Sequence, residues 1–170
     1  VYVADLDRVA GAIGGHYEAA RMPEQAIAWL ERAAAVARRV YAHHDALALV
    51  ERALVLLPSL PGGGTRAAWA ARLHETAGDS HRWLAQYEAA RRAYETALAH
   101  TLPDDRVGRA RLLRKIGKTI ESSNGKFEAV AAFYEQAEGA LGPPAVGDDP
   151  AVWEEWCQIQ MEQLLLLYWW

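Results

Sequence analysis

The chain has 170 residues, a formal net charge of −4 at pH 7 and a single cysteine, Cys157. The acidic balance is a poor match for a phosphate backbone, so we expect this segment to bind no nucleic acid. One cysteine permits neither an intramolecular disulfide nor a cysteine-based zinc site, which is typical of the reducing cytoplasm. The longest apolar run, residues 164–170, is too short to cross a membrane.

Regular apolar spacing divides the chain into helical segments. Apolar residues recur at i, i+3, i+4 and i+7 between clusters of Pro and Gly, and no segment shows the alternation of a strand. Pro23 suits the first turn of a helix, and Asp104 or Asp105, and Asp149, suit N-caps. The pattern predicts an all-α chain of about eight helices, over residues 4–21, 24–42, 45–57, 66–84, 87–101, 105–122, 126–141 and 150–169.

Few residues suggest catalysis or cofactor binding. The glycine-rich stretch 61–65 lacks the lysine and spacing of a phosphate-binding loop, so we interpret it as a flexible connection. The cluster His43–Asp45 is interpreted as a solvated or capped helix end, because adjacent histidines on a helix point in different directions. His74 and His81 lack further ligands that would complete a metal site. We therefore expect no catalysis, no metal and no cofactor in this segment.

A pattern of small residues recurs along the chain. Gly or Ala is followed twelve residues later by Ala, then by a large residue and a second Ala, which in the third set comes one place late. Small side chains let two helices approach closely, and the large one fills the space beside the contact. The sets are Ala34, Ala46, Val50, Ala53 and Pro58; Gly78, Ala90, Tyr94, Ala97 and Pro103; and Gly117, Ala129, Phe133 and Ala137.

This pattern resembles the tetratricopeptide repeat. The resemblance implies a single array over 1–170, folded as a right-handed superhelical solenoid of antiparallel helix hairpins. Ala85 stands where the family usually has a glycine in the turn. The expected parts are an extra N-terminal helix over 1–23, repeats over 24–58, 66–103 and 105–143, and the first helix of a truncated further repeat over 150–170.

A narrower likeness covers the stretches HYEAARMPEQAIAWLERAAAVARRVYAHHDALALVERALVLLP, YEAARRAYETALA, RLLRKIGKTIE and WCQIQMEQLLLLYWW. They resemble the helical-repeat region of large bacterial signalling ATPases, which join a nucleotide-binding switch to such an array and often to a cyclase, kinase or DNA-binding domain. The resemblance implies a non-catalytic regulatory module that docks proteins, peptides or neighbouring domains of a longer parent chain. The start at Val1 without Met agrees with a piece of such a protein. The alternative is a free-standing peptide-binding adaptor; an enzyme or nucleic-acid binder is supported poorly.

In this family the first helix of each repeat lines the concave face, which holds peptides. Residues 105–122 carry six basic and two acidic side chains, so this helix has a charge of +4 in an acidic chain. One interpretation is a site for an acidic peptide or carboxylate, with arginine as a bidentate partner. The other is a solvated face with intrahelical ion pairs. The ligand-binding positions that the family register implies are Arg72, Glu75, Arg111, Arg114 and Lys118.

The last seven residues, Leu164–Trp170, are all apolar. On one helix they span nearly two turns, so apolar groups point in every direction. One face can pack on the preceding helix, while the other needs a cover. We therefore predict self-association through Leu164–Trp170, or terminal tryptophans that fold back or fray.

Overall fold

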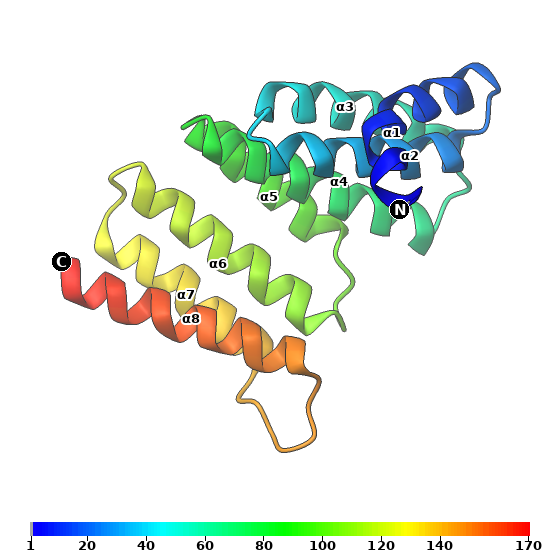
Figure 1. The fold of residues 1–170 in the computed structure, drawn as a ribbon. Helices are drawn as coiled ribbons and strands as arrows, with labels where there is room; N and C mark the ends of the chain where they lie inside the picture. Colours follow the sequence, from blue (N-terminus) through cyan, green and yellow to red (C-terminus); the bar gives the residue numbers. More distant parts are fainter. Residues whose placement is uncertain (1) are drawn as a thin grey trace. The chain divides into compact units, whose positions relative to one another are not determined.

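The computed structural model describes residues 2–170. Within this range the chain forms eight α-helices, one short 3-10 helix and no strand (Figure 1). The prediction of an all-α chain with eight helices is confirmed for this range. The helices are α1 (Tyr2–Ala19), α2 (Pro23–Arg39), α3 (His43–Leu56), α4 (Gly64–Trp83), α5 (Tyr87–His100), α6 (Arg106–Ser122), α7 (Phe127–Leu141) and α8 (Pro150–Trp169), with the 3-10 helix at Leu57–Ser59.

The helices form two compact units, and the chain passes from the first to the second between Gln86 and Tyr87. In the first unit α1 packs on α2, α2 on α3 and α3 on α4, and α2 also contacts α4. In the second unit α5 packs on α6, α6 on α7 and α7 on α8, and α8 also contacts α6 (Figure 1). Such contacts are consistent with a helical repeat. The boundary falls inside the repeat expected over 66–103, so that repeat and the right-handed solenoid stay predictions.

Four turns between helices share one hydrogen-bond pattern. The second residue beyond each helix has a positive φ, and the next residue donates its N–H to a carbonyl five places back, as Ala42 does to Ala37 at 2.9 Å. This is the Schellman motif, in which glycine is favoured because it adopts such a φ without steric strain. Here the four positions are Arg21 (φ 56°), Tyr41 (60°), Ala85 (56°) and Asn124 (59°).

The absence of glycine from the first two of these turns explains the errors in two predicted helix ends. The apolar pattern extended the first two helices to residues 21 and 42, whereas they end at Ala19 and Arg39. No glycine marks either break in the sequence, so the pattern ran through the turn. Ala85, by contrast, was placed correctly, because it takes the conformation of the glycine that it replaces. The helix predicted to start at 66 starts at Gly64, so the glycine-rich connection is shorter than expected.

Helix starts follow the predicted capping residues. The Asp105 carboxylate accepts a hydrogen bond from the backbone N–H of Gly108 at 2.8 Å, and the Asp149 carboxylate accepts one from Ala151 at 2.8 Å. Both α2 and α8 begin with proline, which suits the first helical position. The cap at Asp149 is therefore confirmed, and of the two candidates before α6 it is Asp105, not Asp104, that caps the helix.

The helices α3, α5 and α7 each bury three side chains with the same two spacings. The second buried residue lies four places after the first, and the third lies three places further on. In α7 the sequence pattern placed Ala129 and Phe133 at the packing positions, which is wrong by one residue, because Ala129 is exposed and Phe133 is half-buried. The turn before α7 is one residue longer than the turns before α3 and α5, which shifts the pattern by one place. The fully buried residues are Ala46, Val50 and Ala53; Ala90, Tyr94 and Ala97; and Val130, Tyr134 and Ala137.

The close contact between α6 and α7 depends on Gly117. A Cβ atom at this position would lie 2.8 Å from Cε1 and 3.0 Å from Cδ1 of Tyr134. The Tyr134 side chain is fully buried, so its ring has little room to move away. The small residue that the sequence pattern places at this crossing is therefore required by the packing.

Candidate functional site

The five predicted ligand-binding residues belong to two different units. Arg72 and Glu75 lie on α4 in the first unit, and Arg111, Arg114 and Lys118 lie on α6 in the second. The two sets are therefore described separately, and their joint use as one peptide-binding face stays a prediction.

On α4, Arg72 is held from two sides but remains accessible. Its Nε and Nη2 atoms donate to the two carboxylate oxygens of Glu31 on α2, at 2.9 and 3.3 Å. Its guanidinium group also lies over the ring of Trp69, 4.1 Å from the centroid. The side chain is 53% exposed, so this ion pair contributes little to stability. Glu75, one turn further along α4, is half-buried.

On α6, Arg114 makes a buried ion pair with α8. Its Nε and Nη2 atoms donate to the two carboxylate oxygens of Glu155 at 2.6 and 3.1 Å. Only 14% of the Arg114 side chain and 7% of the Glu155 side chain are exposed. Burial by itself would lower the pKa of Arg114, but the hydrogen bonds and charge of Glu155 outweigh it, so the pKa is raised. The Arg114 guanidinium group therefore stays charged, and its contact with Glu155 joins α6 to α8.

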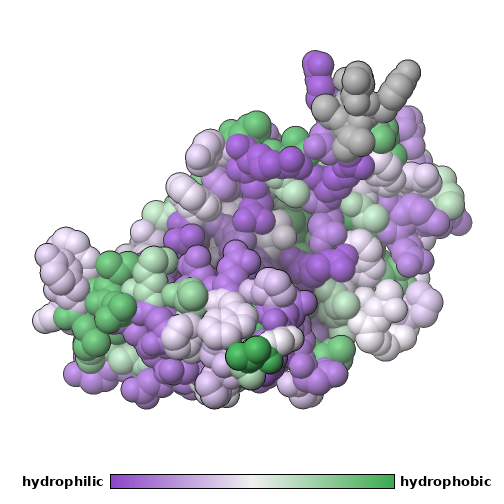
Figure 2. Space-filling view, turned by 60° about the horizontal axis from the view of Figure 1, so that its bottom comes forward, coloured by the Kyte–Doolittle hydropathy of each residue, from purple (hydrophilic) through white to green (hydrophobic). Residues whose placement is uncertain are grey.

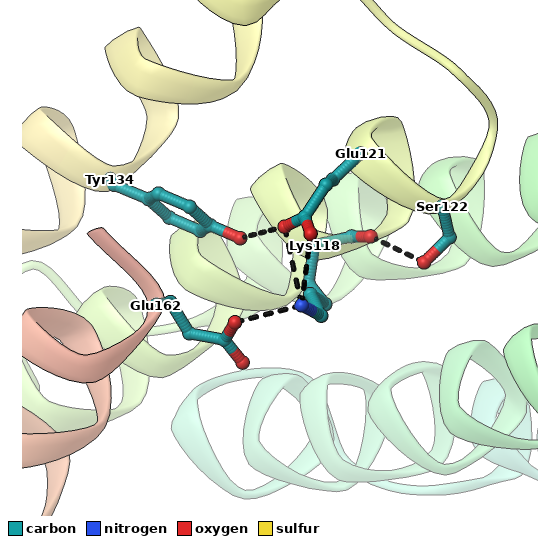
Figure 3. A network of polar contacts seen from close by, with 5 residues as sticks. All are labelled: Lys118, Glu121, Ser122, Tyr134 and Glu162. Carbon is teal, nitrogen blue, oxygen red and sulfur yellow. Dashed lines mark hydrogen bonds and ion pairs between the residues drawn. The ribbon is translucent and has the colours of Figure 1, made fainter. Parts of the chain in front are cut away.

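One turn further along α6, Lys118 lies between two carboxylates (Figure 3). Its Nζ atom donates to Glu121 at 3.1 and 3.2 Å and forms an ion pair with Glu162 of α8 at 2.9 Å. Burial disfavours the charged amine, yet the two carboxylates raise the pKa of Lys118. The hydroxyl of Tyr134 on α7 donates to Glu121 at 2.9 Å, and burial beside that carboxylate raises the pKa of Tyr134. The network thus links α6, α7 and α8.

These contacts bear on the two interpretations of the basic helix α6, a solvated face or a site for an acidic peptide. The carboxylates that bind Arg114 and Lys118 come largely from α8 of the same chain. The solvated-face interpretation is therefore wrong for Arg114, which is buried, although the intrahelical pair of Lys118 with Glu121 does form. An acidic peptide would have to compete with these carboxylates for either cation. These two residues act first as a connection between helices.

Sequence reasoning missed a regular spacing behind such connections. Within the first unit Glu31 pairs with Arg72 and Arg38 pairs with Asp79, and within the second Arg114 pairs with Glu155. The partners lie 41 residues apart in all three pairs. Each pair joins a helix to the helix two places further along the chain. Opposite charges at this spacing were a signal that the sequence carried.

The helix α8 is apolar on two opposite sides. Val152, Ile159 and Leu166 are at most 3% exposed and pack toward α6 and α7. A second apolar stripe faces solvent, with spacings of four, four, three and four residues, so at 3.6 residues per turn it lies on the far side of the helix. This exposed α8 stripe consists of Trp153 (43% exposed), Cys157, Met161 (48%), Leu164 (68%) and Tyr168 (77%).

The stripe extends the apolar surface that the sequence predicted only for the last seven residues. Next to it Leu167 and Trp169 are 67% and 74% exposed, which confirms that one face of this run lacks a cover within the described chain. Trp170 lies 6.0 Å from the ring of Phe127 on α7, centroid to centroid, yet remains 62% exposed. Figure 2 shows hydrophobic residues gathered on the left of the view, where Figure 1 places the end of α8.

The histidine cluster differs from its sequence interpretation. His43 is 7% exposed and stacks on Trp83, so it does not lie at a solvated helix end. The residue that precedes α3, Ala42, offers no side-chain cap. Among residues 6–170, whose side chains the structure describes, there is no group of three His, Cys, Asp or Glu side chains arranged to hold a metal ion. None of the helices in this range combines the length and hydropathy of a bilayer span.

Comparisons with known proteins add no family. A scan against protein-family models finds no match to this sequence, and a search of curated proteins finds no significant relative.

Proposed function

We propose that the chain is a non-catalytic protein-interaction module that binds an amphipathic helix along the exposed α8 stripe. The observation that supports this most directly is the pair of opposite apolar faces on α8, of which one is packed and the other open. Spacings of three and four residues are those by which one helix packs against another. The partner chemistry that fits is therefore a helix with its own apolar stripe.

The composition of the stripe agrees with a binding surface. Tryptophan, tyrosine, methionine and leucine bury large areas, and aromatic residues often dominate the energy of protein interfaces. Each large apolar side chain that moves from water into an interface contributes roughly 1.5–3 kcal/mol before the cost of association. Several such residues on one helix side, with polar Glu154 and Gln158 at its edge, form an extended apolar patch.

The resemblance to bacterial signalling ATPases supports a more specific proposal. In such a setting the docked helix would come from a neighbouring domain of a longer chain, and the module would restrain or report the state of that ATPase. A free-standing adaptor would instead take the helix from another protein. A second copy of this chain is the third source, and it corresponds to the self-association predicted for Leu164–Trp170.

Sedimentation velocity over a range of protein concentrations tests the proposal. A synthetic helix with leucine at the heptad a and d positions serves as the probe, and a scrambled peptide of equal composition serves as its control. We expect the chain to self-associate or to bind the probe helix, and we expect Leu164→Gln with Tyr168→Gln to abolish both. Val55→Gln removes an equally exposed apolar residue (76% exposed) from α3 and should change nothing. A monomer that ignores both peptides would contradict the proposal.

A further inference from the structure

The first unit contains a cleft that is separate from the α8 stripe. It lies where the turn between α2 and α3 meets the end of α4, and its volume is about 560 Å³. Sites for small ligands usually enclose about 300–1,000 Å³. The lining residues are Ala35, Arg38, Arg39, Tyr41, His43 and Trp83.

Three aromatic rings form one wall of the cleft. The rings of His43 and Trp83 are stacked, with centroids 5.5 Å apart and planes 9° apart. Tyr41 meets His43 edge-on at 6.2 Å and Trp83 at 5.8 Å. Tyr41 and Trp83 are nevertheless 73% and 59% exposed, so large aromatic surfaces remain open to solvent. Tyr41 also has a φ of 60°, a strained conformation for a bulky residue that gains little burial here.

Buried polar atoms in the cleft lack hydrogen-bond partners. His43 is 7% exposed, and neither Nδ1 nor Nε2 makes a hydrogen bond. Nε of Arg38 is likewise buried without a partner, although Nη2 of the same group donates to Asp79 at 2.6 Å. Such unsatisfied groups are uncommon in native proteins because each loses its hydration without compensation. A bound group with acceptor atoms would supply the missing partner of Arg38.

The charges around the cleft select the sign of the ligand. Arg38 and Arg39 both line it, and two guanidinium groups repel a cation that the aromatic rings would otherwise attract. Arg39 is 66% exposed and has only a 3.4 Å contact with Asp7, which binds Arg32 more closely at 2.7 Å. Asp79 and Asp7 offset part of the positive charge, so the cleft suits a singly charged anion better than a doubly charged phosphate.

We infer that this cleft binds an aromatic carboxylate, with the ring of the ligand against Tyr41 and Trp83 and its carboxylate on Arg38 and Arg39. The same chemistry has two sources. One is a free aromatic acid, and the other is a peptide in which an aromatic residue lies next to an acidic one. This inference is independent of the α8 stripe, which lies in the other unit.

Nuclear magnetic resonance titration of the full chain tests the inference. The probe is N-acetyltryptophan, which carries both the aromatic ring and the carboxylate. Three controls each change one feature: N-acetyltryptophan amide lacks the charge, N-acetylalanine lacks the ring, and tryptamine carries a positive charge instead. We expect N-acetyltryptophan to shift the Trp83 indole N–H and the amides of residues 35–43. The amide should bind about tenfold more weakly, because it loses a charge-assisted hydrogen bond, and the other two should cause no shift. A capped peptide containing Glu-Trp distinguishes the sources, since tighter binding than N-acetyltryptophan identifies a peptide ligand.

Two variants locate the binding without endangering the fold. Tyr41→Gly removes one ring and at the same time relieves the strained φ, so the chain should fold at least as well and bind about tenfold more weakly. Arg39→Glu should abolish binding, whereas Arg66→Glu, at an exposed residue of α4 outside the cleft, should leave it unchanged. Equal binding of N-acetyltryptophan and its amide, unchanged binding in both cleft variants, or no shift with any probe would overturn the inference.

Discussion

Replacement of Glu155 by glutamine tests whether the ion pair between α6 and α8 holds the second unit together. The side chain is nearly buried, and its two oxygens accept the two hydrogen bonds of Arg114. Removal of one partner from a buried pair destabilises a protein by about 3–5 kcal/mol, because the other charge is left uncompensated. Glutamine keeps one acceptor oxygen, and Glu162 still attracts Arg114, so we expect a smaller loss than this range, about 2–3 kcal/mol.

The assay is thermal and denaturant unfolding followed by circular dichroism, with hydrogen exchange on α8. For a unit of this size the expected loss lowers the melting temperature by roughly 10 °C or more. Glu154→Gln is the matched control, because the carboxylate of Glu154 is next to Glu155 in the chain but exposed, so its loss should change the free energy of unfolding by less than about 0.5 kcal/mol. The double variant Arg114→Met with Glu155→Leu should recover stability, since no unpaired charge remains. Equal stability of the Glu155→Gln and Glu154→Gln variants would refute this account of the network.

Three further predictions concern local packing and protonation, each measured by unfolding. Gly117→Ala should destabilise the chain by about 1–3 kcal/mol through the clash with the Tyr134 ring, whereas Gly139→Ala, with no atom within 4 Å of the new Cβ, should stabilise α7 by about 0.5–1 kcal/mol. Ala85→Gly should stabilise by about 0.5–1 kcal/mol, because glycine adopts the φ of 56° without strain. Burial, with the charges of Arg38 and His44, lowers the pKa of His43 below its usual value of 6.5. The unfolded chain therefore binds more protons than the folded chain, so the free energy of unfolding should fall as the pH drops below 6.5. The variant His43→Phe should remove that part of the pH dependence.

The sequence predicted those helix boundaries well that are marked by a capping aspartate or an N-terminal proline, because these residues act through local contacts. Asp105, Asp149 and Pro23 act at the position where they stand, and their capping geometry needs no distant contact. The ends of α1 and α2 were missed because Arg21 and Tyr41 adopt a glycine-like φ that no sequence pattern reveals. The register of α7 was one place wrong because a single extra residue in a turn shifts every buried position after it.

The candidate surfaces were harder to predict, since they depend on contacts between distant residues. The charges of α6 suggested a solvated or ligand-binding cationic face, but Arg114 pairs with Glu155 of α8 and Lys118 is shared between Glu162 of α8 and Glu121 of α6 itself. His43 was assigned to solvent, because its neighbour in the fold is Trp83, forty residues further along the chain. The apolar run at the end of α8 was recognised from sequence. The longer stripe could be recognised only in the structure, which shows that Val152, Ile159 and Leu166 are buried while the apolar residues on the opposite side of α8 are exposed.

The position of Cys157 allows the central claim to be measured directly. It is the only cysteine of the chain, it is exposed, and it lies within the α8 stripe between Trp153 and Met161. A small trifluoromethyl label on its sulfur reports contact by fluorine magnetic resonance as the leucine-heptad helix is added. The account predicts a saturable shift of the fluorine signal, absent with the scrambled peptide and lost in the variant with Leu164→Gln and Tyr168→Gln. An unchanged fluorine signal throughout the titration would contradict the claim that this stripe binds a helix.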